Sequence, residues 1–329
     1  MHASKNKLLE LRTIMTKMTL DMCCVSALPE FGVRWRDVTR AVRNARLPMT
    51  PASVARVIHR HVAKHLSDEV LDEIVARLRL KMVVSQNRTW HVISLSEPMS
   101  DEPVNVLAQV LPSRVERALR KSKIGQRMTP EVQTVNMGDL LYMSIQLVSA
   151  AKQSAVWYVA TPPGQPVMLV SSPHSGLMKA IVPGLGYQKY EDASLNGRDV
   201  ASLLRIHNQG YTDHASHLAA VPEYMPTPVV TANGVDYTNR TYDEQYVQGL
   251  LGPDPPKLTN LTVKSSKPFF DAQRLNKKMT LTLQLRSEDI AKTLAEWAAR
   301  GALAPTSDLY HIFHRIKSNK ITYDADELE

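Results

Sequence analysis

Cysteine is almost absent from this sequence, and its two cysteines, Cys23 and Cys24, are adjacent. Adjacent positions argue against a structural disulfide, and so few cysteines exclude a cysteine-rich zinc site. No apolar run approaches the ~18 to 20 residues that a membrane span requires, and residues 1–17 lack the apolar core and the cleavage site of a secretory signal. We therefore expect no membrane association and a location in the cytoplasm or nucleus.

Motifs that carry catalysis or hold cofactors are also missing. Gly184 and Gly186 lack the third glycine of a dinucleotide loop and the Gly-Lys-Ser/Thr ending of a P-loop. His61 and His65 have the four-residue spacing of a metal pair, but no glutamate accompanies them and the neighbouring arginines and lysine would repel a cation. We predict no catalytic residue, no metal and no cofactor, and hence a protein that is not an enzyme.

The positive charge of the chain is concentrated in its first part. The formal net charge is +8, and the residues up to Arg127 contain 22 Lys plus Arg against 12 Asp plus Glu. Such a one-sided balance raises the affinity for a polyanion in a salt-dependent way. The simpler alternative is a basic surface that only interacts with solvent.

Residues 1–110 are predicted to form a helical domain. Apolar residues recur there at spacings of three and four, as on the buried face of a helix. Thr50 followed by Pro51 predicts the start of one helix, and Ser67 predicts the cap of the next.

Residues 111–213 are predicted to form a small α/β domain. Met143, Ile145 and Leu147 alternate with polar residues, which indicates a strand. Two apolar segments flank the turn-forming residues 161–166 and predict a β-hairpin. A helix is expected over residues 198–207.

The rest of the chain divides into a linker and a last domain. Residues 214–257 are rich in Pro, Thr and Asn and are interpreted as an extended linker. Residues 258–329 are expected to combine an antiparallel sheet with a helix that Ser287 caps and Gly301 ends. Its apolar face comprises Leu281, Leu283, Leu285, Leu294 and Trp297. This face either packs within its own domain or binds a partner chain, and the overall fold class is α+β.

Several segments, taken in order, resemble the centromere protein N family of inner-kinetochore subunits. The segments are Arg12–Ile14, Ser67–Ile74, Arg88–Val92, Ser154–Trp157, Val170–Ser172, Leu195–Leu203 and Thr293–Leu309. The resemblance implies a pyrin-like helical bundle and an α/β domain that together clasp nucleosomal DNA in the nucleus. It also implies a carboxy-terminal domain that pairs with a centromere protein L-like subunit, in an assembly with other inner-kinetochore subunits.

The resemblance also implies which basic residues contact DNA. Arg12, Arg88 and Arg198 match family positions directly. Lys17, Arg43, Arg46, Lys179 and Lys189 lie close to family basic positions without strict alignment.

This sequence departs from the family on the first helix. Family members place acidic residues four and eight positions before the matched arginine, where this chain has Leu8 and Ser4. Recognition of a centromeric histone variant is therefore not implied by these residues. The alternative to DNA binding is a protein-binding adaptor with a pyrin-like domain and no direct DNA contact.

Overall fold

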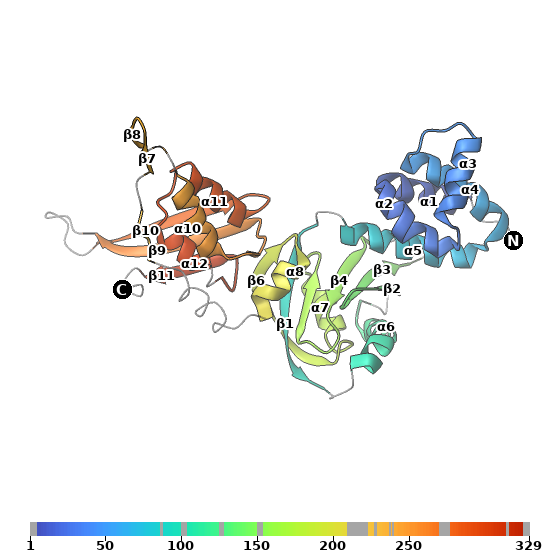
Figure 1. Cartoon of the computed structure of the whole chain (residues 1–329). Coiled ribbons are helices and arrows are strands. Elements are labelled where there is room, and N and C mark those ends of the chain that lie inside the picture. Colours follow the sequence, from blue (N-terminus) through green and yellow to red (C-terminus); the bar gives the residue numbers. More distant parts are fainter. Residues whose placement is uncertain are drawn as a thin grey trace. The chain divides into compact units, whose positions relative to one another are not determined.

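The computed structural model is a mixed α+β protein, as the sequence predicts (Figure 1). It describes residues 5–85, 88–99, 104–124, 128–149, 154–208, 223–226, 229–236, 238, 240–269, 277–313 and 316–324. The chain forms two compact units: Met1–Arg88 with Leu95–Tyr190, and Thr89–Ser94 with Glu191–Glu329. We refer to them as unit 1 and unit 2.

Unit 1 begins with a helical bundle. Its longer helices are α1 (Lys5–Lys17), α3 (Trp35–Asn44), α4 (Pro51–His65) and α5 (Asp68–Ser85), and its short ones are α2 (Leu20–Met22), η1 (Cys23–Ala27) and η2 (Leu28–Phe31). One core joins them, in which Leu11, Met15, Ile58 and Leu71 are fully buried. The structure does not identify the arrangement of these helices as pyrin-like, so that part of the prediction stays a prediction.

The predicted helix starts in the bundle are confirmed. Thr50 is the N-cap of α4: its Oγ1 accepts a hydrogen bond from the backbone N–H of Ser53 at 3.3 Å, and Pro51 is the first helical residue. Helix α5 begins at Asp68, directly after Ser67. A cap satisfies backbone N–H groups that have no partner within the helix, which explains why these residue types predict the boundary.

A six-stranded antiparallel sheet has the order β2-β3-β4-β5-β1-β6. The strands are β1 (Trp90–Pro98), β2 (Thr129–Met137), β3 (Leu140–Val148), β4 (Trp157–Thr161), β5 (Val167–Val170) and β6 (Tyr187–Gly197). The predicted hairpin around residues 161–166 is confirmed, because β4 and β5 pair antiparallel. The strand predicted around residues 143–147 is confirmed as β3, and Ser144 is buried together with Met143 and Ile145, so β3 is covered on both faces.

Three helices accompany this sheet: α6 (Val104–Lys121), α7 (Ser175–Ile181) and α8 (Val200–Asn208). Helix α6 packs against β2 and α7. Gly184, just after α7, makes a close approach to α6, since a Cβ built on it would lie 2.8 Å from the Cα of Val115. Any other residue would push these two segments apart.

Unit 2 contains a three-stranded sheet with the order β10-β9-β11. Its strands are β9 (Asn260–Phe269), β10 (Lys277–Arg286) and β11 (Lys320–Asp324). The expectation of a purely antiparallel sheet is wrong, because β11 pairs parallel to β9. The connection from β9 to β11 runs through β10, α11 and α12, and a connection of this length allows β11 to lie parallel to β9.

The segment 214–257, expected to be an extended linker, contains regular structure in its described residues. Strands β7 (Val229–Thr231) and β8 (Gly234–Asp236) pair with each other, and α10 (Thr241–Leu251) follows. Val247 and Leu250 of α10 are buried. The helix forms because tertiary burial of this apolar face outweighs the surrounding composition.

Helix α11 (Ile290–Ala299) starts later than predicted. Its N-cap is Asp289, whose Oδ1 accepts from the backbone N–H of Lys292 at 3.2 Å. Ser287 instead shares a hydrogen bond with the Thr293 hydroxyl at 2.7 Å. The predicted end of the helix at Gly301 is confirmed, because Gly301 follows the helix with a φ of +65°. Helix α12 (Asp308–Phe313) follows, and the Tyr310 hydroxyl donates to the Leu294 carbonyl at 3.2 Å.

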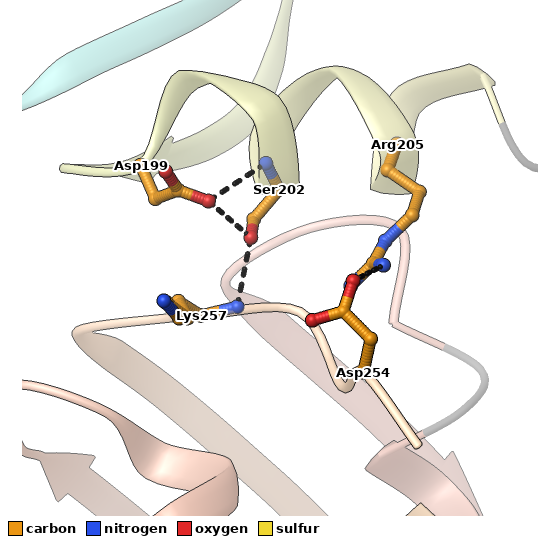
Figure 2. Close-up of polar contacts among 5 residues, drawn as sticks. All are labelled: Asp199, Ser202, Arg205, Asp254 and Lys257. Atoms are coloured by element: carbon orange, nitrogen blue, oxygen red, sulfur yellow. Dashed lines mark hydrogen bonds and ion pairs between the residues drawn. The ribbon is translucent and has the colours of Figure 1, made fainter. Parts of the chain in front are cut away.

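Within unit 2, polar contacts tie α8 to the segment that leads into β9. Figure 2 shows the Ser202 hydroxyl accepting from the backbone N–H of Lys257 at 2.9 Å and donating to Asp199. Nearby, Arg205 Nη1 lies 2.7 Å from Asp254 Oδ2 (Figure 2). These contacts fix α8 relative to the start of the three-stranded sheet.

Candidate nucleic-acid and partner interfaces

Helix α3 presents a row of arginines directly opposite its buried side. Val38 and Val42 are fully buried, whereas Arg36, Arg40 and Arg43 are exposed. At about 100° per residue, the three arginines fall within roughly 60° of one another on the face opposite the valines. None of them forms an ion pair with a described residue. We call this row the α3 ridge.

The like charges of the α3 ridge lower the stability of its helix. Like charges at i and i+4 on one helix face destabilise that helix by a few tenths of a kcal/mol. An anion laid along the face removes the repulsion. Of the predicted DNA-binding residues, Arg43 belongs to the ridge, while Arg46 follows the helix with a φ of +52° and donates its N–H to the Arg43 carbonyl at 2.9 Å.

The two predicted DNA-binding residues of α1 do not share a face. Arg12 and Lys17 are both exposed. Their five-residue separation places them about 140° apart around the helix. A DNA backbone that lies along one face of α1 therefore does not contact both residues.

Basic residues of α5 are used inside the bundle. Glu30 Oε1 accepts a hydrogen bond from Lys81 Nζ at 2.6 Å, and Glu30 Oε2 forms an ion pair with Arg77, 3.1 Å from its Nε. Arg79 pairs with Glu10 in the same way. These ion pairs tie α5 to α1 and η2, so α5 contributes little free positive charge to the surface.

Arg88 and Lys189, also predicted to contact DNA, both have partners in unit 1. The Arg88 guanidinium lies over the Tyr158 ring, 4.7 Å from its centroid. Burial raises the pKa of Tyr158, and the Arg88 charge partly opposes that rise. Stacking leaves the N–H edge of a guanidinium able to donate to phosphate. Lys189 pairs with Glu97, which offsets its charge.

A second basic surface in unit 1 is a hollow of about 520 Å³ between α6 and α7. We call it the basic hollow. Its cations are Arg114, Arg117 and Lys121 of α6 and the predicted DNA-binding residue Lys179 of α7. No carboxylate is among its described lining residues. The first three belong to the basic first part of the chain but were not among the predicted DNA contacts. Their spacing of three and seven residues places them on one helix face.

Arg198, the last predicted DNA-binding residue, belongs to unit 2. It is exposed and lines a polar basin of about 760 Å³. Asn196, Asn260 and Asn319 form part of the wall and bond to one another, with Asn260 Nδ2 donating to Asn196 Oδ1 at 2.8 Å. The amides are thus committed to joining β6 with β9 and β11.

The predicted partner interface divides into exposed and buried residues. Leu281 and Leu283 on β10 are 63% and 37% exposed, whereas Leu285 is 7% and Leu294 is 0% exposed. Leu285 and Leu294 therefore pack within unit 2 and do not lie on the surface that a partner chain would contact. Trp297 is half-buried and, with both of them, lines a 160 Å³ pocket beside the end of β10.

The exposed leucines of β10 lie on an edge strand of the three-stranded sheet. Among the described strands, β10 is an edge of the β10-β9-β11 sheet, so its outer backbone groups pair with no strand there. Edge strands with exposed apolar side chains are templates for pairing with another chain. We call this strand, with Leu281 and Leu283, the β10 edge.

In the described part of the chain, no group of three His, Cys, Asp or Glu side chains is placed to hold a metal ion. No helix there is both long and apolar enough to cross a membrane. No family model matches the sequence, and no curated protein matches it significantly.

Proposed function

We propose that unit 1 binds the phosphate backbone of duplex DNA. The observation that carries this proposal is the α3 ridge, in which Arg36, Arg40 and Arg43 point away from the core without ion-pair partners among the described residues. Successive arginines along a helix can each replace a condensed counterion of DNA. Arg12 and Arg88 are further proposed contacts. No zinc finger or RNP signature is present in the sequence, so recognition is of backbone and shape.

Replacement of Arg36, Arg40 and Arg43 by Gln tests the ridge. Duplex DNA binding by the full chain is measured by fluorescence anisotropy over a range of salt concentrations. We expect weaker binding and a log–log salt slope shallower by roughly three, about one for each lost phosphate contact. The matched control replaces Lys257, Lys292 and Arg300, which are exposed in unit 2, by Gln and keeps the parental slope. Equal slopes for both triple variants would refute the ridge as a DNA contact.

We further propose that the β10 edge pairs with a partner chain. The resemblance noted in the sequence indicates a centromere protein L-like subunit. The proposed role is then that of an inner-kinetochore subunit in the nucleus, which joins nucleosomal DNA to that partner and to other kinetochore subunits. Support for this proposal comes from Leu281, which is 63% exposed on an edge strand.

The β10 edge is tested with Leu281→Arg and Leu283→Arg together. Both side chains are exposed, so we expect the variant to fold normally. We expect loss of copurification with a coexpressed centromere protein L-like subunit, and unchanged DNA binding. Thr280→Arg with Thr282→Arg, on the opposite face of the same strand, is the matched control. Retained copurification of the leucine variant would exclude the β10 edge.

The adaptor alternative makes a different pair of predictions. In it the helical bundle of unit 1 binds other proteins, its positive charge only interacts with solvent, and DNA binding shows no steep salt slope. The two experiments above therefore separate a DNA-binding subunit from a pure adaptor.

A further inference from the structure

The basic hollow combines two chemical features. Its rim carries four cations, three from one face of α6 and Lys179 from α7. Lys121, Arg117 and Lys179 are exposed. The rim therefore attracts an anion from solution.

The basic hollow is also lined by apolar residues. These are Met99, Ala118, Ala180 and Pro183, and we call them the floor to distinguish them from the cations. Met99 is 58% exposed although it is a large apolar side chain. Gly184 also lines the hollow, and its lack of a side chain lets the turn after α7 lie against the backbone of α6.

An apolar floor distinguishes this surface from the α3 ridge. A phosphate backbone needs donors and cations, and it gains little from contact with methionine or proline side chains. A peptide with both carboxylates and apolar side chains uses both features, because arginines and lysines hold the carboxylates while the apolar side chains lose water against the floor. The volume of about 520 Å³ lies within the range of ordinary ligand sites.

We propose that the basic hollow docks an acidic peptide segment of a partner protein, with at least one apolar side chain placed against Met99. Lys179 then contacts protein carboxylates rather than DNA. This docking site shares no residue with the α3 ridge or the β10 edge. Its test is therefore independent of the DNA-binding and strand-pairing proposals.

The test uses the full chain and a short fluorescein-labelled peptide of Glu and Leu. Matched peptides replace either every Leu by Ser or every Glu by Gln, and duplex DNA is a further probe. The rim variant carries Arg117→Gln, Lys121→Gln and Lys179→Gln, and the floor variant carries Met99→Ser. We expect each variant to weaken binding of the Glu/Leu peptide by about tenfold or more, equivalent to about 1.4 kcal/mol. Both matched peptides should bind less tightly than the Glu/Leu peptide.

Two outcomes would overturn the proposal. If the Ser peptide binds as tightly as the Leu peptide and Met99→Ser changes nothing, the hollow attracts anions by charge alone. If the rim variant loses duplex DNA affinity and keeps peptide affinity, the occupant is the nucleic-acid backbone. The expected result is that the rim variant and Met99→Ser both lower the affinity for the Glu/Leu peptide, and that Met99→Ser leaves the affinity for DNA unchanged.

Discussion

Asp243→Ala should lower the free energy of unfolding of unit 2 by about 2 kcal/mol, because hydrogen bonds to a charged group are lost. The Asp243 side chain is only 8% exposed. Its Oδ1 accepts from the Tyr224 hydroxyl at 2.7 Å, and its Oδ2 accepts from Arg240 Nη1 at 3.0 Å. The Arg240 guanidinium also lies against Gly301 at the end of α11. The carboxylate thus connects α10, the end of α11 and the segment around Tyr224, and its loss leaves the partly exposed Tyr224 hydroxyl and Arg240 guanidinium without their acceptor.

Urea unfolding followed by circular dichroism measures this effect. Tyr224→Phe is the matched control, because it removes a single hydrogen bond and should cost about 1 kcal/mol. The same contact should also affect the titration of Tyr224, because burial first and the hydrogen bond to Asp243 second raise its pKa to about 12. An Asp243→Ala variant as stable as the Tyr224→Phe variant would show that the Arg240 pair contributes nothing.

Gly184→Ala should destabilise unit 1 by about 2 kcal/mol, through overpacking rather than through backbone strain. The added methyl would lie 2.8 Å from the Cα of Val115 and 3.1 Å from the carbonyl oxygen of Ile181. Both neighbours are backbone atoms, so no side-chain rotation relieves the clash. Helix α6 must move away from the turn after α7, which also widens the basic hollow.

Gly249→Ala is the matched control for this substitution. Gly249 lies inside α10, and a Cβ there meets nothing within 4 Å. Alanine is the better helix former by roughly 0.5 to 1 kcal/mol, so this variant should gain stability. Thermal unfolding of both variants gives the comparison. A gain in stability for Gly184→Ala would mean that α6 and the turn are not in close contact.

Local signals in the sequence predicted much of the fold. Thr50 and Pro51 mark the start of α4 because a cap and a first-turn proline depend only on neighbouring residues. The β4–β5 hairpin follows from its turn for the same reason. Helix α10 was missed, although Asp243, Val247 and Leu250 have helical spacing, because the proline-rich surroundings indicated a linker.

The candidate sites depended more on tertiary structure. The α3 ridge could have been found from the spacing of Arg36, Arg40 and Arg43 opposite two valines. That Lys179 lies in the same hollow as the α6 cations could not have been predicted, because it requires α7 to pack on α6. Likewise, alternation places Leu281 and Leu285 on one face of β10, but burial of only the second depends on where other parts of unit 2 cover that face.

The tie between α8 and the lead into β9 constrains how this part of the chain can diverge in evolution. Ser202 accepts its hydrogen bond from the main chain of residue 257, so the side chain of Lys257 is irrelevant to that bond. Position 257 should therefore drift freely among homologous proteins, with proline alone forbidden because it has no N–H. Ser202 and Asp199 act through their side chains, and we expect them to change together or not at all.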